Sequence, residues 1–407
     1  MTFTILHGNN LDILPTLPDN SVDSIVTDPP YELGFMGKKW DSSGIAYSVE
    51  LWTECLRVLK PGGHLLSFGG SRTYHRMVVG IEDAGFEVRD MISWISNKTF
   101  PKSLDVSKAI DKAAGAEREI VTSYSAAKQK GSVAWSGKDR SNGQGSGFGE
   151  TAHVTIPKTP EAQEWKGWGT GLKPAVEPIV MARKPLIGTV VHNVLTYGTG
   201  ALNIDGSRVA TTDNLAGGTY GGTFGAERDE NGNVPKAIGS GDKGRWPANI
   251  ILDEHTAGSL DKQSGHLHGS GNISDVENDK GAGYEASGYE ISYNGRANRD
   301  FGVKGGGASR FFYVAKASKR DRNEGLEQSN IHPTVKPTAL MEYLVKLVTP
   351  PNGTVLDPFT GSGSTGKAAI LNGFDFIGIE MTEDYLPIID ARLKQAEATY
   401  GSQIRID

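Results

Sequence analysis

The chain has 407 residues, of which 37% are hydrophobic and 22% charged, and its formal net charge is −6. This composition is typical of a globular protein of two or three domains, and the single cysteine, Cys55, excludes a disulfide framework and a cysteine-rich zinc site. No apolar run is long enough to span a membrane and the N-terminus lacks the pattern of a signal peptide, so we expect a cytoplasmic protein with no membrane partner.

The first part of the chain, residues 1–114, alternates between strand and helix patterns. The predicted elements are a strand at 21–28, a helix at 47–60, a strand at 64–70, a helix at 71–86 and a strand at 87–96. Pro61, Gly62 and Gly63 form a stop signal at the end of the first helix. Alternation of this kind predicts an α/β fold with a parallel, doubly wound sheet.

The middle part, residues 115–309, holds most of the 53 glycines. Two strand-like segments interrupt it, at residues 177–185 and 245–253. The rest is expected to form long loops, which inside a compact domain are usually functional or lack fixed structure. His266 and His268 have no further ligands beside them, so we expect no metal ion.

The last part, from about residue 310, returns to the alternating pattern. The predicted elements are a strand at 309–316, a helix after Pro337, a strand at 353–357, a helix at 365–373, a strand at 374–380 and a helix at 384–397. We therefore expect one sheet built from both ends of the chain, with a glycine-rich insertion between them.

A glycine-rich stretch, VLDPFTGSGSTGKAAI (residues 355–370), reads as strand, loop and helix. A phosphate-binding P-loop needs Ser or Thr after the lysine, and Ala368 stands there instead. In a dinucleotide site the glycines follow the strand directly, whereas Asp357 and two further residues intervene here. A carboxylate at that position repels pyrophosphate and suits the cationic amino acid part of S-adenosylmethionine (AdoMet), and Glu380, at the end of the next strand, is placed for ribose hydroxyls.

A second motif, TDPPY (residues 27–31), also follows a predicted strand. The carboxylate of Asp28 and the carbonyl of Pro29 can accept both hydrogens of an exocyclic amine, and Pro30 helps to fix the backbone because proline restricts φ. The ring of Tyr31 offers a surface for a base that has swung out of a duplex. Asp-Pro-Pro is also a common turn sequence, but the pairing of two such motifs at strand ends favours a role in catalysis.

The two motifs together resemble those of the amino-methyltransferases of DNA in which DPPY precedes the AdoMet loop, the beta group. Further segments, 167–185 and 245–253, resemble a phage and prophage branch. The resemblance implies a Rossmann-like, mostly parallel seven-stranded sheet with one antiparallel strand. It also implies a catalytic domain of residues 1–190 and 310–407, with the target-base half first, and a target-recognition insertion at residues 191–309.

The resemblance also implies roles for individual residues. The catalytic residues would be Asp28, Pro29, Pro30 and Tyr31. The residues that bind AdoMet would be Asp357, Pro358, Phe359, Gly361, Ser362, Gly363, Thr365, Glu380, Thr334, Lys336 and Asn9. Asn9 stands where family members often carry Asp, and for Thr334 and Lys336 a solvent-exposed turn before a helix is an equal alternative.

Contacts with DNA are expected from two basic segments. The net negative charge argues mildly against a polyanion partner, but a local basic strip is sufficient for binding. The expected residues are Lys38, Lys39 and Trp40 in a loop after DPPY, and Lys316, Lys319, Arg320 and Arg322 in KASKRDR. An ordinary surface loop and a solvated charged face are the alternatives.

The sequence therefore predicts a site-specific, AdoMet-dependent DNA methyltransferase that acts on double-stranded DNA, with the 6-amino group of adenine as the target. The alternatives are methylation of the cytosine 4-amino group, an RNA or protein amide methyltransferase, and a non-catalytic DNA-binding relic. Cys55 lies inside a predicted helix, which argues against methylation of cytosine carbon-5 by a cysteine nucleophile. A homodimer, and a separate restriction endonuclease in a restriction-modification system, are left open.

Overall fold

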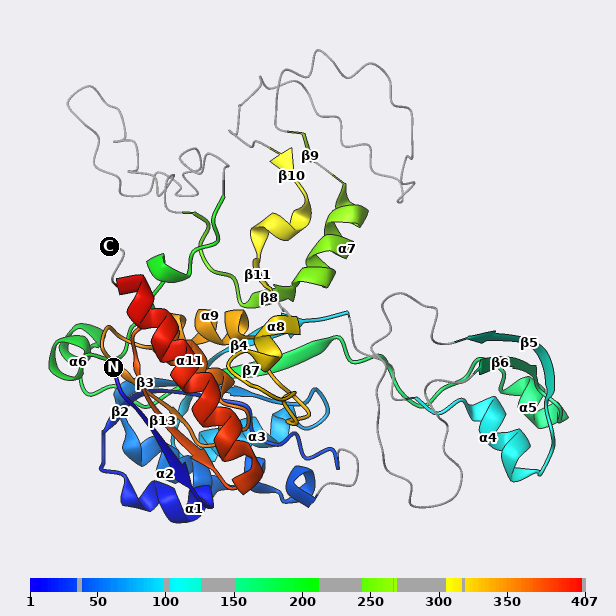
Figure 1. Ribbon diagram of the computed structural model, residues 1–407, viewed down its shortest axis with the longest axis horizontal. Coiled ribbons are helices and arrows are strands. Elements are labelled where there is room, and N and C mark those ends of the chain that lie inside the picture. The colour runs from blue at the N-terminus through cyan, green and yellow to red at the C-terminus, as the bar shows by residue number, and fades with distance from the viewer. Residues whose placement is uncertain are drawn as a thin grey trace. The chain divides into compact units, whose positions relative to one another are not determined.

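The computed structural model describes residues 1–34, 39–97, 103–125, 151–211, 244–265, 267–268, 305–316 and 319–404. The chain divides into two compact units (Figure 1). The first is formed by Met1–Lys98 together with Ala175–Asp407, and the second by Thr99–Pro174. The second unit lies within residues 1–190, and the described residues of the segment expected as an insertion, 191–309, lie in the first unit, so the division into units does not follow the predicted domains, which stay a prediction. The predicted role of that segment in target recognition stays a prediction too.

A nine-stranded sheet forms the centre of the first unit. Its strands, in spatial order, are β1 (Phe3–His7), β13 (Asp375–Glu380), β12 (Thr354–Asp357), β2 (Val22–Thr27), β3 (Leu59–Phe68), β7 (Val176–Arg183), β4 (Glu87–Ile95), β8 (Ile250–Asp253) and β11 (Tyr313–Ala315). Strand β7 runs antiparallel to both of its neighbours, and the other neighbouring pairs are parallel. Strands from the two ends of the chain pair directly, as β1 and β13 do in Figure 1.

This sheet confirms the predicted doubly wound, mostly parallel α/β fold built from both chain ends. The first seven strands in the spatial order correspond to the seven that the resemblance implied, and one of them is antiparallel. The number seven is too low for the whole sheet, because the short strands β8 and β11 continue it beyond β4.

Helices cover both faces of the sheet, since the side chains of a strand alternate between its faces. In β2 and β3, Ile25 and Leu65 pack in one apolar cluster with α2 (Val49–Val58) and α3 (Tyr74–Asp83). Their neighbours Val26 and Leu66 pack in the other, which contains α9 (Thr338–Val348), α10 (Ser364–Leu371) and α11 (Leu386–Ile404). Cys55 lies in the first cluster, fully buried, and burial raises the pKa of its thiol.

The remaining elements of the first unit are short, apart from the 11-residue helix α7. They comprise α1 (Asn10–Ile13), α6 (Val190–Tyr197), α7 (Glu254–Ser264), α8 (Lys319–Asn323), the pair β9 (Leu267–His268) and β10 (Gly305–Gly306), and 3-10 helices at Leu14–Thr16, Lys39–Ser42, Ile45–Tyr47, Asp205–Ser207, Ala308–Phe311 and Glu383–Tyr385. In the described part of the chain, no helix combines the length and apolarity needed to cross a membrane.

Three predicted boundaries are wrong. The stop expected at Pro61–Gly63 lies inside β3, where Gly62 adopts a positive φ of 77° and the register against β2 shifts, so a bulged strand absorbs the turn signal. Of the strand expected at 245–253, only the part that forms β8 is a strand. The segment expected as a strand at 309–316 forms a 3-10 helix followed by β11.

The second unit contains elements that the sequence patterns missed. They are α4 (Val106–Ala113), the antiparallel pair β5 (Glu119–Ser125) and β6 (Thr151–Ile156), and α5 (Pro160–Glu164). The fully buried Asp111 joins them. Its carboxylate pairs with Arg118 at 2.8 Å and accepts the backbone N–H groups of Lys158 and Thr159 at 3.0 and 2.9 Å. These hydrogen bonds hold the pKa of Asp111 below its usual value although burial alone would raise it.

Candidate active site

The two sequence motifs meet at the carboxyl ends of two neighbouring strands in the sheet. Strands β2 and β12 are parallel neighbours, with Leu356 opposite Ile25, so their carboxyl ends lie side by side. The hydroxyl of Thr27 donates a 2.6 Å hydrogen bond to Oδ1 of Asp357. The start of TDPPY is therefore in direct contact with the start of the glycine-rich loop.

Backbone amides hold the carboxylates of the glycine-rich loop. Glu380, at the end of β13, accepts the N–H of Gly361 at 2.8 Å through one oxygen and that of Thr382 at 2.7 Å through the other. Asp357 accepts the N–H of Phe359 at 3.0 Å. Gly361 has a positive φ of 56°, and a Cβ there would lie 2.9 Å from Nε2 of His332, so this position needs glycine.

Burial changes the proton affinity of both carboxyl groups. It raises the pKa of Asp357 to about 6, although hydrogen bonds from Thr27, Thr365 and the Phe359 amide act in the opposite direction. Burial also raises the pKa of Glu380, again against the backbone hydrogen bonds that it accepts. Carboxylates in this environment are favoured as anions once a cationic ligand group lies beside them.

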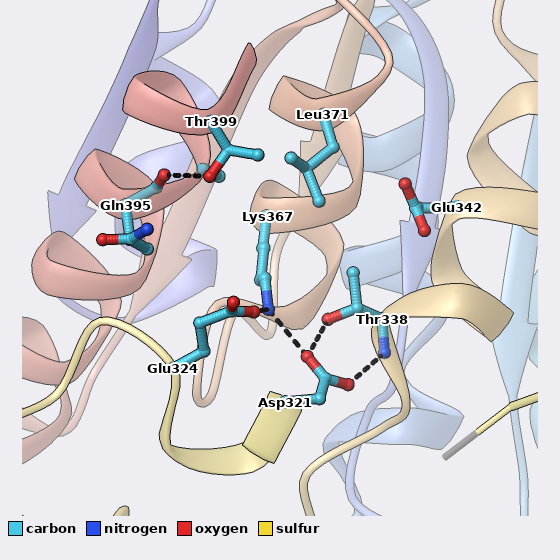
Figure 2. A pocket seen from close by; sticks show the side chains of 9 residues that line it. Asp321, Glu324, Thr338, Glu342, Lys367, Leu371, Gln395 and Thr399 are labelled. Atoms are coloured by element: carbon cyan, nitrogen blue, oxygen red, sulfur yellow. Dashed lines mark hydrogen bonds and ion pairs between the residues drawn. The ribbon is translucent and has the colours of Figure 1, made fainter. Parts of the chain in front are cut away.

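The lysine of the loop points away from the strand ends. The ammonium of Lys367 is buried and pairs with Asp321 at 2.7 Å and Glu324 at 2.8 Å, as Figure 2 shows. Asp321 also accepts the N–H and the hydroxyl of Thr338 at the start of α9. A P-loop lysine would have to reach a phosphate, and here two carboxylates neutralise it instead.

The cavity drawn in Figure 2, of about 230 Å³, lies around this lysine. Its lining includes Asp321, Glu324 and Glu342, and none of the residues predicted to bind AdoMet or the target base lines it. The cavity is therefore separate from the edge of the sheet where the two motifs meet. The hydrogen bonds there, and not this cavity, define the candidate site.

Charged and polar groups surround the carboxylate of Asp28. Its Oδ2 pairs with the ammonium of Lys336 at 2.8 Å, and Lys336 lies 3.2 Å from Glu177 on β7. The hydroxyl of Tyr31 donates to Glu177 at 2.7 Å and accepts from Lys336 at 3.1 Å. The other oxygen of Asp28, Oδ1, is buried and has no hydrogen-bond partner among the described residues.

The electrostatics of this group depend on burial and on one cation. Burial raises the pKa of Asp28, and Lys336 acts against that rise. Burial and the neighbouring carboxylates Asp28 and Glu177 raise the pKa of Tyr31 well above its usual value. Burial alone would lower the pKa of Lys336, but the same two carboxylates raise it. The lysine is thus kept charged, and its charge favours an ionised Asp28.

With this geometry established, a family model gives the class of protein. The model described as DNA methylase (N6_N4_Mtase) matches residues 22–391, which is most of the chain. The chain belongs to this DNA methylase family. Membership confirms the predicted DNA methyltransferase class, and the fold described above agrees with it.

Relatives of known name match over shorter segments. The chain is 46% identical over 70 residues to the type II methyltransferase M2.LlaDCHI of Lactococcus lactis subsp. cremoris, covering 17% of this chain and 26% of that protein. It is 46% identical over 67 residues to the type II methyltransferase M.ScaI of Streptomyces caespitosus, covering 16% and 22%. The matched segment thus spans about a quarter of the length of these relatives.

Among solved structures, the PvuII DNA methyltransferase, described as cytosine-N4-specific, aligns with 98% of this chain and 92% of its own. The sequence identity is 13% and the TM-score is 0.43. The family model, and not this likeness, carries the assignment.

In this chain, one short segment contacts both motifs. The ring of His332 lies edge-on against Tyr385, 4.7 Å between centroids, and beside Gly361. Burial lowers the pKa of His332 to about 4, so the ring is neutral near pH 7. Four residues later Lys336 reaches Asp28. Of the two residues predicted here as cofactor ligands, Thr334 is exposed, and Lys336 is buried and pairs with Asp28 and Glu177.

Other predicted cofactor residues surround the loop. Ser362, Gly363 and Thr365 lie at its turn into α10, where the buried Arg392 donates to the carbonyl of Ser362 at 2.6 Å. Asn9 is exposed, and its side chain caps α1 by accepting the N–H of Leu11 at 3.2 Å. Its neighbour Asn10 is buried and donates to the carbonyl of Pro358 at 3.4 Å. Asn10 is therefore the residue of this pair that contacts the loop.

The predicted DNA-contact residues fall into three groups. Lys38 lies outside the described residues, as do the side chains of Lys39, Trp40 and Lys319. Lys316 and Arg320 are exposed. Arg322 is exposed too, and it donates to the backbone carbonyls of Asn330 and His332 at 3.3 and 2.6 Å, which ties it to the segment before Lys336.

Sequence patterns missed five residues, of which all but Asp41 come from parts of the chain distant from the motif residue that they contact. They are Glu177, Asn10, His332, Arg392 and Asp41, the last of which accepts the backbone N–H groups of Glu32 and Leu33 just after DPPY. Two of them stood next to predicted features: Glu177 begins the strand-like segment at 177–185, and His332 lies two residues before Thr334.

Proposed function

We propose that this protein transfers a methyl group from AdoMet to an exocyclic amine in double-stranded DNA, with the 6-amino group of adenine as the target. The observation that carries the proposal is the buried Oδ1 of Asp28, an acceptor without a partner among the described residues, directly beside the carboxyl end of β12. A buried acceptor of this kind is costly unless a ligand supplies the missing donor. The hydrogens of an amine are suitable donors.

The glycine-rich loop fits AdoMet better than a nucleotide phosphate. Its strand end carries the carboxylate of Asp357, and its lysine is neutralised elsewhere by Asp321 and Glu324. AdoMet would supply an activated methyl group on a sulfonium. Asp357 would face its ammonium group and Glu380 its ribose, and Gly361 would let the backbone approach the ligand closely.

The residues of TDPPY act on the amine. Asp28 and the carbonyl of Pro29 accept its hydrogens, which turns the nitrogen lone pair toward the incoming methyl group. The nitrogen lone pair would form the new bond to the methyl carbon as the carbon–sulfur electrons return to sulfur, which gives S-adenosylhomocysteine, and the extra proton on the nitrogen would pass to solvent. Tyr31 has its hydroxyl fixed by Glu177 and Lys336, so its ring can support the base in one orientation. Catalysis then depends mainly on positioning and electrostatics.

Adenine is the preferred base because Asp stands first in the motif, and cytosine 4-amino methylation is the runner-up. The further proposals are a beta-group, phage-type enzyme with a cytoplasmic setting, target recognition by residues 191–309, and a place in a restriction-modification system. The type II names of the relatives support the last of these.

The test is methyl transfer from labelled AdoMet to unmethylated duplex DNA, followed by digestion to nucleosides and identification by mass. The expected product is 6-methyladenine. A 4-methylcytosine product would keep the reaction and change the base. Transfer to RNA or protein in place of DNA, or AdoMet binding without any transfer, would contradict the proposal.

A further inference from the structure

Lys336 is the buried cation nearest to the DPPY carboxylate in the described contacts, and its ion pairs and ring contacts are on the target-base side. Its ammonium contacts Asp28 and Glu177, and it lies over the rings of Tyr31 and Phe68, 5.2 and 4.8 Å from the centroids. Its side chain is 10% exposed. A lysine that bound the methionine part of AdoMet would instead be expected against the glycine-rich loop.

Glu177 completes this arrangement from a strand that belongs to neither motif. It lies on β7, the antiparallel strand, and its carboxylate accepts from Tyr31 and pairs with Lys336. The group formed by Asp28, Lys336, Glu177 and Tyr31 thus holds two carboxylates and one ammonium. Its formal charge is −1 when both carboxylates are ionised and the phenol is neutral.

We propose that Lys336 and Glu177 are positioning residues for the target amine, which fix the orientation and the charge of Asp28, and that Lys336 is not a cofactor ligand. Lys336 holds Oδ2 and leaves Oδ1 to accept the amine hydrogen. Glu177 offsets the charge of Lys336, so that the group as a whole keeps a net negative charge where positive charge develops on the amine. This inference rests on the proposed methyl transfer.

The proposal gives opposite pH signatures for two substitutions. The titratable and charged groups that face Asp28 are Lys336 before α9, Glu177 on β7, Tyr31 in its own loop and Asp357 on β12. Lys336→Met removes the cation, so the pKa of Asp28 rises and the acid limb of the kcat profile moves up by about one pH unit or more. Glu177→Gln leaves the cation unopposed, so the acid limb moves down.

The experiment measures kcat against pH, and AdoMet binding by calorimetry, for the full chain. In Lys336→Met we expect kcat at neutral pH to fall by about 100-fold while the Kd for AdoMet changes less than about threefold. Lys394→Met is the matched control, because Lys394 is exposed on α11 and pairs only with Asp390 among the described contacts. It is expected to leave both quantities unchanged. Retained AdoMet binding also shows that a variant is folded.

Two further variants keep the test decisive if Lys336→Met does not fold. Lys336→Arg retains the cation and should keep the acid limb in place, and Glu177→Gln should still move it down. In the double variant Lys336→Met with Glu177→Gln, the acid limb should return toward the wild type, because one charge of each sign is removed.

The experiment distinguishes a failure of the proposed function from a failure of this inference alone. If the wild type transfers no methyl group to DNA, the proposed function fails and this inference fails with it. If the wild type is active but Lys336→Met weakens AdoMet binding tenfold or more, with the acid limb unmoved, only the inference is overturned, and Lys336 is a cofactor ligand.

Discussion

The carboxylates beside the glycine-rich loop and the carboxylate of the DPPY motif are held in different ways. Beyond β12 and β13, Asp357 and Glu380 accept the backbone N–H groups of Phe359, Gly361 and Thr382, and Asp357 also accepts the hydroxyl of Thr27 on β2. Beyond β2, Asp28 is held by the side chain of Lys336, from a remote part of the chain.

The difference has a physical consequence. A carboxylate bound by amides of adjacent turns keeps its place as long as the loop keeps its shape, which suits a preformed binding site for AdoMet. A carboxylate bound by a lysine responds to every charge around it, since opposite charges within a few ångströms change its pKa by whole units. The AdoMet side should therefore depend less on remote charges than the target-base side, with Thr27 and Asp28 as the neighbours that couple Asp357 to the other motif.

The substitution expected to have the largest effect is Asp28→Ala. It removes the acceptor for the target amine and leaves Lys336 with Glu177 alone, so we expect methyl transfer to fall by about 10³-fold. AdoMet binding should persist, because the hydrogen bonds of Asp357 and Glu380 come from backbone amides. Single-turnover methyl transfer and calorimetry measure the two effects on the same preparation.

Asp28→Asn is the matched control for shape. It keeps one acceptor oxygen and loses the charge, so an activity near that of Asp28→Ala assigns the effect to charge. Near-normal activity of Asp28→Ala would remove this residue from the mechanism.

A second substitution tests Lys367, the lysine on α10 that follows the glycine-rich loop. Lys367→Met leaves Asp321 and Glu324 without their buried cation, so the free energy of unfolding should drop by about 3 kcal/mol. The Kd for AdoMet should stay within a few-fold of the wild type, because Lys367 points away from the strand ends. Urea unfolding and calorimetry measure both quantities, with the exposed Lys394→Met expected to cost less than about 1 kcal/mol. Loss of AdoMet binding in folded Lys367→Met would restore the P-loop interpretation.

The same contrast explains which part of the candidate site could be predicted from the sequence. The strand–loop–helix pattern around Asp357 and the position of Glu380 depend on nearby residues, and local patterns of glycine and apolar residues are sufficient to recognise them. The hydrogen bonds of Glu380 to Gly361 and Thr382 span 19 and 2 residues. This part of the candidate site, and the α/β order of the sheet, could be predicted.

The surroundings of Asp28 could not be predicted in this way. Tyr31 meets Glu177 across 146 residues and Lys336 across 305 residues, so both contacts depend on how β7 and the segment before α9 pack. Asn9 and Asn10 are indistinguishable as letters, and only the start of α1 decides which side chain caps the helix. The second unit was missed because Asp111, a charged residue in a helix pattern, gives no hint of its buried role.

The last prediction concerns how stability and AdoMet affinity depend on pH. Burial raises the pKa of Asp357 to about 6 from the 3.8 of an unperturbed carboxyl, so the folded state binds this proton more tightly than the unfolded state. Its contribution to stability is complete below about pH 4 and is lost as the pH rises through the folded pKa of about 6. The affinity for the cationic ammonium of AdoMet should change in the opposite direction, rising about tenfold between about pH 5 and pH 7 as the carboxylate ionises.

Asp357→Asn separates these effects, because the amide does not titrate. The variant should lack the loss of stability between about pH 4 and pH 6, worth about 3 kcal/mol in the wild type, and its weaker AdoMet affinity should be nearly flat over the same range. Urea unfolding and calorimetry at matched pH values measure the two trends. An AdoMet affinity that rises equally in the wild type and in Asp357→Asn would assign the titration to another group, and the carboxylate of Asp357 would then have no direct part in holding the ligand.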